Sequence, residues 1–162
     1  MATTDKYRRH GSMALATGLL LGIVGTLPVL AQANFETFNL SEASPTSRVS
    51  GFTTGIVALS NIAGRDGRGT ICAGFADTTP DHIMVLEQDF DSLILQVDSG
   101  GNDTSLLIQG PNDSTVRCGQ DTNRRNPDAR VEDQGWQTGT YRIWVGSHHQ
   151  GQRYNYSLSV SP

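Results

Sequence analysis

The feature that most restricts the fold of this chain is a two-residue alternation of apolar and polar side chains in several short segments. Apolar residues occupy every second position of 93–97, and the same pattern continues over 154–160. This period is typical of strands that bury one face, whereas no segment after residue 33 sustains the period of a helix. Turn-forming residues separate the segments, as in Ser99-Gly100-Gly101-Asn102 and Gly110-Pro111-Asn112-Asp113. The chain therefore alternates between strands and tight turns.

Turns about every ten residues predict an all-β fold, a single antiparallel β-sandwich of jelly-roll type. The 18 glycines and the charged fraction of 17% fit such a turn-rich protein better than a helical bundle. Residues 41–48 are predicted to be a mobile linker, and 64–69 and 120–128 to be loops. Strands are expected near 35–40, 49–59, 82–88, 92–98, 104–109, 114–118, 129–133, 139–146 and 154–161.

The first 33 residues have the organisation of a secretory signal peptide. A basic stretch at 6–10 precedes an uncharged apolar run at 13–30, and the small-residue cleavage signature Ala31-Gln32-Ala33 follows. Cleavage after Ala33 would begin the mature chain at Asn34. A retained membrane anchor is the alternative, since the apolar run approaches the length that spans a bilayer. The predicted organisation is a signal peptide at 1–33, an N-terminal strand and linker at 34–48, and the sandwich domain at 49–162.

Export has consequences for the two cysteines, Cys72 and Cys118. An even number of cysteines in an exported chain predicts a disulfide between them. A catalytic thiol would need a free, activated sulfur, and two ligands so far apart in sequence are weak evidence for a metal site. We expect a disulfide-linked protein in the periplasm or outside the cell.

Charge and composition exclude several function classes. No lysine occurs after residue 33, which excludes a P-loop lysine, a Schiff-base lysine and a Ser-Lys dyad. The net charge of −4 disfavours nucleic acid, whose binding proteins carry concentrated basic surfaces. Nothing after residue 33 is long and apolar enough to cross a membrane.

The last 90 or so residues resemble a known family, estimated by eye against its strand-and-turn pattern. The motifs that carry the resemblance are Leu93-Ile94-Leu95-Gln96-Val97, Asn102-Asp103-Thr104-Ser105-Leu106-Leu107-Ile108, Gly110-Pro111-Asn112, Cys118-Gly119-Gln120-Asp121, Gly139-Thr140-Tyr141-Arg142-Ile143-Trp144-Val145 and Tyr154-Asn155-Tyr156-Ser157-Leu158. In this order they resemble the bacterial pre-peptidase C-terminal domain, a β-sandwich module similar to the collagen-binding sandwiches of secreted collagenases. Members of that family are non-catalytic and usually follow a secreted peptidase, so the resemblance implies a non-catalytic module. Here the module follows a signal peptide with no peptidase between them, which leaves open any role in peptidase maturation.

Aromatic and basic side chains are the candidate ligand-binding residues. Trp144 falls on the outward face of its strand, Trp136 precedes that strand, and exposed tryptophan rings stack on sugars or fill pockets in protein partners. The alternative is structural, with Trp144 beneath a loop and Trp136 plugging one end of the sandwich. Arg124, Arg125 and Arg142 would add a patch for an anionic ligand, unless neighbouring acids neutralise them.

Turn acids are the candidate metal ligands. Calcium prefers six to eight oxygen ligands, and Asp98, Asp103 and Asp121 lie in or beside turns of an exported chain. No EF-hand loop is present, however, so solvated turn carboxylates are the alternative. His148 and His149 are expected to point to opposite sides of an extended chain, and His82 to have a surface or capping role.

No motif of a hydrolase is present, such as Gly-x-Ser-x-Gly or His-Glu-x-x-His. The sequence therefore predicts an exported non-catalytic module that binds a cell-envelope or extracellular polymer or protein and needs no cofactor. A calcium-stabilised sandwich and a small secreted hydrolase are the alternatives.

Overall fold

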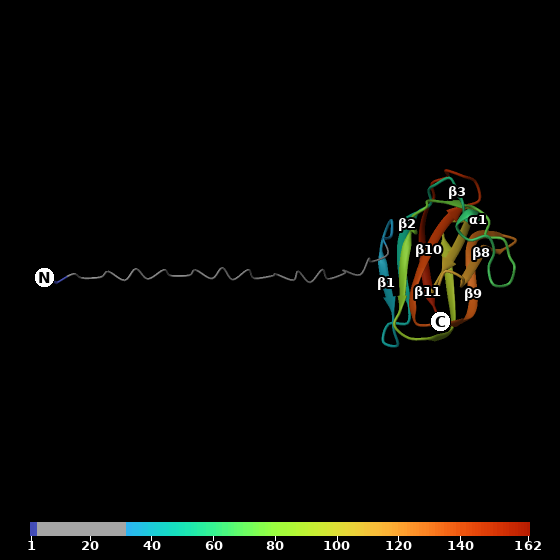
Figure 1. Cartoon of the computed structure of the whole chain (residues 1–162). Coiled ribbons are helices and arrows are strands. Elements are labelled where there is room, and N and C mark those ends of the chain that lie inside the picture. The colour runs from blue at the N-terminus through green and yellow to red at the C-terminus, as the bar shows by residue number, and fades with distance from the viewer. Residues whose placement is uncertain (3–31) are drawn as a thin grey trace.

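The structure is a computed structural model that describes residues 1–2 and 32–162. The predicted signal peptide lies outside the described residues apart from its first and last two positions. The described part forms one body of strands with a single short helix among the described elements (Figure 1). No helix in this part of the chain has the length and hydropathy of a membrane span.

Eleven strands and the helix follow one another along the chain. In order, they are β1 (Thr37–Leu40), β2 (Ser47–Phe52), β3 (Val57–Ala58), α1 (Leu59–Ile62), β4 (Phe75–Ala76), β5 (His82–Leu86), β6 (Phe90–Asp98), β7 (Thr104–Gln109), β8 (Val116–Asn123), β9 (Asn126–Trp136), β10 (Gly139–Ser147) and β11 (Asn155–Ser161). The all-β fold class is confirmed.

The strands form two layers that share one strand. The first layer has the order β1-β5-β10-β7-β8, and the second has the order β8-β9-β6-β11-β2. The N-terminal half of β8 pairs with β7, and its C-terminal half pairs with β9. Gly119 lies at this change of partner, where a Cβ atom would collide with the backbone of Arg130 and lie 2.7 Å from Val131 Cγ2. Glycine is therefore required where the strand turns from one layer into the other.

The core lies between the two layers and a smaller core lies outside the first. Alternate residues of β6, β10 and β11 point into the main core, as their two-residue pattern predicts. On the outer face of the first layer, Leu59, Cys72, Ala76, Leu107 and Trp144 form the second cluster. The chain from β3 through α1 to β4 supplies three of these five side chains and covers that face.

The predicted disulfide is confirmed. Cys72 and Cys118 are bonded, with their Cα atoms 5.3 Å apart, and no free cysteine remains in the described residues. The bond ties the covering segment to β8, next to Gly119.

Three predictions about local structure are wrong. Residues 41–46 lie outside the strands as expected, but Ser47 and Arg48 belong to β2 and β1 is an edge strand of the first layer, so the segment connects two strands of the sandwich instead of leading into it. The segment 120–128 is not a loop, since β8 and β9 continue through it to a turn at Arg124 and Arg125. The strand expected at 49–59 ends at Phe52, and β3 and α1 follow it.

One strand pair departs from an antiparallel sandwich. β1 pairs with β5 in parallel, with Thr37 opposite Ile83 and Leu40 opposite Leu86. The chain leaves β1 for the opposite layer, crosses the first layer's outer face and returns before it forms β5. Such a long excursion permits the parallel direction, which a short hairpin excludes.

Candidate functional site

Trp144 is not an exposed ligand-binding residue, and the structural alternative, with Trp144 beneath a covering segment, is the one that the structure shows. Its side chain does face outward from β10, but only 3% of the residue is accessible, because α1 and the chain around Cys72 lie over it. The indole Nε1 donates to the carbonyl of Thr78 at 3.3 Å. Trp144 is therefore a core residue and cannot stack on a ligand.

Trp136 is also buried and closes one end of the main core. The centre of its ring lies 5.4 Å from that of Tyr141, and the Arg117 guanidinium lies over the ring with Cζ 4.0 Å from the ring centre. Its Nε1 donates to the carbonyl of Asp133 at 2.9 Å. The alternative of a structural Trp136 is the one that the structure shows.

The three candidate arginines do not form one patch. Arg124 and Arg125 are exposed at the β8–β9 turn, where the Arg125 amide donates to Asn123 Oδ1 at 2.9 Å. Arg142 lies on β10 and pairs with Asp113, so its charge is neutralised there. The predicted anionic-ligand patch is therefore reduced to the tip of one hairpin.

The candidate calcium ligands are also dispersed. Asp98 pairs with Arg48 at 3.6 Å, Asp103 lies 3.9 Å from His148 Nδ1, and Asp121 is on β8. Among the described residues, no group of three or more His, Cys, Asp or Glu side chains is arranged to hold a metal ion. The acid that organises the 99–102 turn is Asp128, whose carboxylate accepts hydrogen bonds from Ser99 and Gly101.

His148 and His149 are exposed between the last two strands, as expected, but two other histidine expectations are wrong. His148 and His149 do not point apart, because they lie in a bend and their rings are 4.9 Å from each other. His82 is fully buried rather than on the surface, and its Nε2 lies 2.9 Å from the Tyr156 hydroxyl. Burial lowers the pKa of His82 to about 4, so the ring is neutral at physiological pH.

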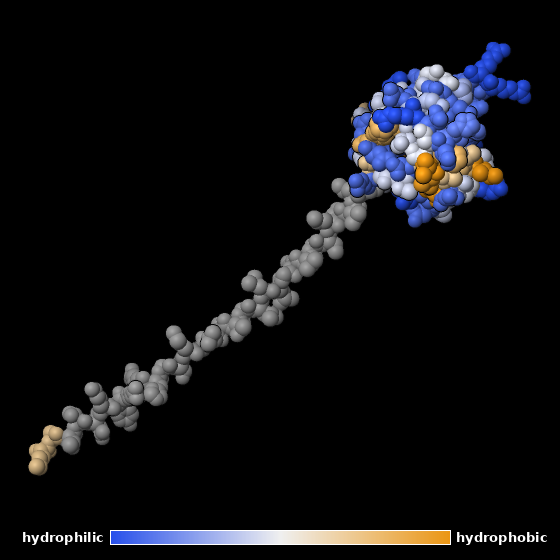
Figure 2. All heavy atoms as spheres, turned by 90° about the horizontal axis from the view of Figure 1, so that it is seen from above, coloured by the Kyte–Doolittle hydropathy of each residue, from blue (hydrophilic) through white to orange (hydrophobic). Residues whose placement is uncertain are grey.

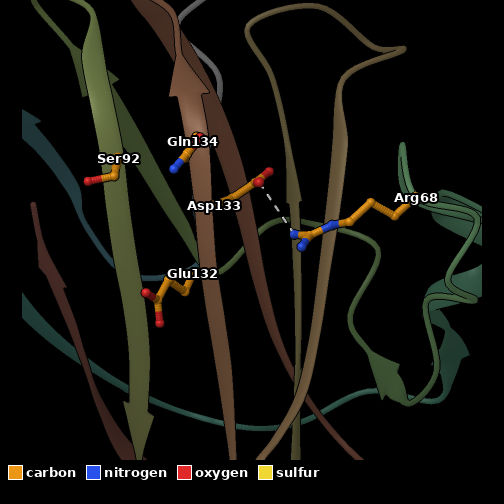
Figure 3. A pocket seen from close by; sticks show the side chains of 5 residues that line it. All are labelled: Arg68, Ser92, Glu132, Asp133 and Gln134. Carbon is orange, nitrogen blue, oxygen red and sulfur yellow. Dashed lines mark ion pairs between the residues drawn. The ribbon is translucent and has the colours of Figure 1, made fainter.

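A polar hollow of about 580 Å³ lies beside β6 and β9. Its lining residues all carry hydrogen-bonding groups: Arg68, Ser92, Glu132, Asp133 and Gln134. Figure 3 shows Ser92 on one strand, the three residues of β9 on the next, and Arg68 reaching toward Asp133 from the opposite side. The site therefore combines outward side chains of β6 and β9, the Asp133 side chain from the other side of β9, and one side chain of a loop.

A second hollow of about 340 Å³ adjoins the first. It lies between the 66–68 loop and residues 114–117, and it shares Arg68 and Asp133 with the first hollow. The two side chains form an ion pair of 3.5 Å between Arg68 Nη2 and Asp133 Oδ1. The two residues of this ion pair therefore line both hollows.

Asp133 is fixed from below by Arg117. The Arg117 Nε donates to Asp133 Oδ2 at 2.7 Å, and its Nη2 donates to the carbonyls of Gln134 and Gly135 at 3.3 Å each. Only 9% of the Arg117 side chain is accessible, and its Nη1 has no hydrogen-bond partner within the described part of the chain. The floor of the site is rigid, because one arginine ties β8 to the end of β9.

Arg68 is the adaptable part of the site. Its loop is held by Asp66, whose Oδ1 accepts hydrogen bonds from the amides of Arg68 at 2.9 Å and Thr70 at 2.8 Å. The disulfide at Cys72 anchors the chain two residues later. The backbone is thus fixed, whereas 61% of the Arg68 side chain is accessible and it holds one long ion pair.

The arrangement can bind a polar ligand. No histidine or cysteine lines either hollow, and the lining offers hydrogen-bond donors, acceptors and one displaceable charge. Apolar surface is limited elsewhere: Figure 2 shows orange spheres in separate groups on a mostly polar face, and Ile56 and Ile71 are the most exposed large apolar residues inside the folded body.

Sequence reasoning missed this site, although one signal was present. In the sequence, Glu132 and Asp133 are only two of the acids that would neutralise the candidate arginines, and Arg68 lies within the loop predicted at 64–69. The buried alternation of β9, which runs through Ala129 and Val131, places Asp133 at the next inward position. A carboxylate at such a position indicates a buried cation nearby, which is Arg117.

No family model matches the sequence, and no curated protein matches it. Among solved structures, the fold is similar to the pre-peptidase C-terminal domain of a collagenase from Bacillus anthracis, with a TM-score of 0.45, 12% identity, and coverage of 80% of this chain and 97% of that one. It is also similar to PliG, a periplasmic inhibitor of g-type lysozyme from Aeromonas hydrophila, with a TM-score of 0.43, 14% identity, and coverage of 80% and 98%. The domain that the sequence motifs resemble is thus among the similar solved structures.

Proposed function

We propose that this chain is an exported, non-catalytic module that binds a polar polymer of the cell envelope or extracellular medium. The observation that carries the proposal is the pair of adjoining hollows that are both lined by the ion pair of Arg68 and Asp133. When Arg68 swings away, the two hollows join into one groove. An extended ligand would then lie across β9 against Ser92 and Gln134.

The energetics permit that movement. An exposed ion pair of this kind contributes about 0–1 kcal/mol to stability. A ligand that offers Arg68 another acceptor therefore compensates for the broken ion pair with Asp133. Asp133 keeps its bond to Arg117 in either state. The floor of the groove therefore stays formed while the ion pair of Arg68 and Asp133 opens.

The lining favours a glycan over a protein. The centre of a protein–protein interface is apolar and rich in aromatic residues. The larger hollow has instead a polar lining, and both tryptophans are buried. Sugar hydroxyls both donate and accept hydrogen bonds, which matches the mixed set of Arg68, Gln134 and the carboxylates of β9.

The experiment compares Arg68→Ala with Arg124→Ala, a matched loss of one exposed arginine at the hairpin tip. Both variants should keep the wild-type melting temperature. Binding to isolated peptidoglycan and to soluble wall polysaccharide should weaken about tenfold or more in Arg68→Ala only, because a hydrogen bond to a charged group contributes about 1.5–3 kcal/mol. Equal binding by Arg68→Ala and wild type would contradict the proposed site.

The same panel tests the alternatives. g-type lysozyme, the target of one similar structure, is the protein arm, and its capture in place of glycan would identify a protein partner. Calcium and a chelator are added to separate melts, and a shifted melting temperature would support a calcium-stabilised sandwich. Turnover of ester, peptide or glycoside substrates would contradict a non-catalytic module.

A further inference from the structure

We propose that the α-amino group of Asn34, once the leader is removed after Ala33, binds the acidic site formed by Asp77 and Asp81. Leader removal would then add stability that the precursor lacks. This inference rests on the expected cleavage position and is independent of the proposed binding function.

Asn34 already has a fixed place in the fold. Its backbone nitrogen donates to the carbonyl of Pro80 at 2.8 Å, and the next amide, of Phe35, donates to the carbonyl of Asp81 at 3.0 Å. The Asn34 side-chain nitrogen reaches the carbonyl of Thr79 at 3.2 Å and Asp81 Oδ1 at 3.4 Å. These bonds join the segment before β1 to the segment before β5, so the predicted first residue of the mature chain is held beside the start of the sheet.

The acidic site lacks a cation. Asp81 is 2% accessible, and its Oδ2 accepts a hydrogen bond from the Val145 amide at 2.7 Å. Within residues 32–162, neither Asp77 nor Asp81 forms an ion pair with an arginine or a histidine. Burial, with a smaller contribution from the charge of Asp77, raises the pKa of Asp81 to about 7. An ionised carboxylate in such a place needs a counter-charge.

The site has room for an ammonium group. A hollow of about 260 Å³ opens beside Asn34 and is lined by Phe35, Phe52, Thr54 and Asp77 as well. A peptide nitrogen carries one hydrogen and no charge, whereas an ammonium carries three hydrogens and a positive charge. One N–H can keep the Pro80 carbonyl while the other two are free for the hollow, which Asp77 lines, and for the neighbouring Asp81.

Cleavage supplies this group by ordinary hydrolysis. A leader peptidase adds one water across the Ala33–Asn34 bond, which leaves a carboxylate on Ala33 and an amine on Asn34. The amine takes up a proton at neutral pH, because the ordinary pKa of an α-amino group is about 7.7–8.0. The charge therefore appears only after the leader has left.

Arg153 is a cation close to the hollow, with its Cζ 3.2 Å from the centre of the Phe52 ring, but it forms no ion pair with Asp77 or Asp81 within residues 32–162. The other groups around Asp81 supply no cation at neutral pH. These groups are Asn34 and Glu36 from the N-terminal segment, His82, the backbone of β10 and Tyr156 from β11. His82 is neutral at this pH because burial lowers its pKa to about 4, and burial raises the pKa of Tyr156. Glu36 adds a further negative charge. The Asn34 ammonium would thus be the counter-ion of the site.

The experiment compares two chains released from a cleavable fusion without an added methionine. One begins at Asn34 and the other at Gln32, so that two residues separate the amine from the site. At pH 7 the chain that begins at Asn34 should melt about 3 °C or more higher, which corresponds to about 1 kcal/mol in a domain of this size. Identical melting temperatures would overturn the proposal.

Variants identify the carboxylates that are responsible. The combined change Asp77→Asn and Asp81→Asn should abolish the difference between the two chains. Asp91→Asn, which removes an exposed carboxylate elsewhere, should keep it. A difference that survives the combined change would overturn the proposal.

A direct titration covers the case in which the Asn variants do not fold. NMR of the chain that begins at Asn34 should give an α-amino pKa about one unit above its ordinary value, whereas an ordinary or lower value would overturn the proposal. N-terminal sequencing of the exported protein should give Asn34 first. Another first residue would overturn this inference and leave the Arg68 site untouched.

Discussion

Replacement of Trp144 by alanine is the perturbation that separates a structural from a ligand-binding tryptophan. The side chain is 3% accessible and packs in the second core with Leu59, Cys72 and Leu107. Truncation of a buried tryptophan to alanine costs about 3–5 kcal/mol, because apolar contacts are lost and a cavity remains. The lost bond from Nε1 to the Thr78 carbonyl adds about 0.5–1.5 kcal/mol.

This loss is large against the stability of a whole domain, which is about 5–15 kcal/mol. The melting temperature should fall by about 10 °C or more. Trp144→Phe keeps most of the apolar contact and should lose less than half as much. Binding to the ligand of the Arg68 site should be unchanged wherever the variant is folded.

Urea unfolding followed by fluorescence gives the free energy of unfolding of each variant. Trp136 lies in the main core and remains as the probe when Trp144 is replaced. A loss below about 1 kcal/mol for Trp144→Ala, together with weaker ligand binding, would refute the reasoning. That result would mean that the ring is exposed, as its outward position on the strand first suggests.

Three further changes test the frame of the fold. Gly119→Ala should lower the free energy of unfolding by about 1–3 kcal/mol or more, because the new Cβ collides with the backbone of Arg130 where β8 passes from one layer to the other. A free energy of unfolding equal to that of wild type in denaturant titrations would contradict a strand shared by both layers. Replacing Cys72 and Cys118 by serine should cost about 4 kcal/mol in the chain-entropy model, and a melting temperature equal to that of the oxidised protein would contradict a structural disulfide. The pKa of His82 is about 4 in the folded protein, below its ordinary value of 6.5. As the pH falls, His82 therefore takes up a proton in the unfolded chain first, and the protein loses stability between pH 6.5 and pH 4. Relative to His82→Phe, wild type should lose up to about 3 kcal/mol over that range in urea titrations, and parallel pH profiles of the two proteins would contradict this assignment.

The strand content was predictable from the sequence because strands that bury one face alternate. β6, β7, β10 and β11 lie where the apolar residues recur every second position, between turns rich in glycine and asparagine. The disulfide followed from export and an even number of cysteines. The strands follow from local sequence patterns and the disulfide from the number of cysteines, so neither prediction needs knowledge of long-range packing.

What covers the outer face of the first layer was not predictable in the same way. Trp144 was correctly placed on the outward side of β10, yet whether it meets solvent depends on where the chain from β3 to β4 folds back. That chain has no periodic pattern, and its position is set by its disulfide and by the contacts of Leu59. Periodicity assigns a face to a residue but says nothing of a covering segment.

The hairpin of β8 and β9 and the burial of Asp81 and His82 have similar explanations. The polar stretch before Asn126 looks like a loop because its strands are exposed near the tip, and only cross-strand pairing keeps them extended. Asp81 and His82 are polar, and polarity predicts exposure, yet backbone and hydroxyl partners from β10 and β11 make their burial tolerable. Partners distant in sequence decide each of these cases.

Chemical-shift mapping of the isotope-labelled protein against solubilised envelope glycan measures whether the Arg68 site binds a glycan. We expect shifts concentrated in the amides of 66–68, Ser92 and 132–134, with those of the hairpin tip at Arg124 and Arg125 unchanged. Shifts centred on that tip, or none in 132–134 at saturating glycan, would show that the glycan does not bind at this site.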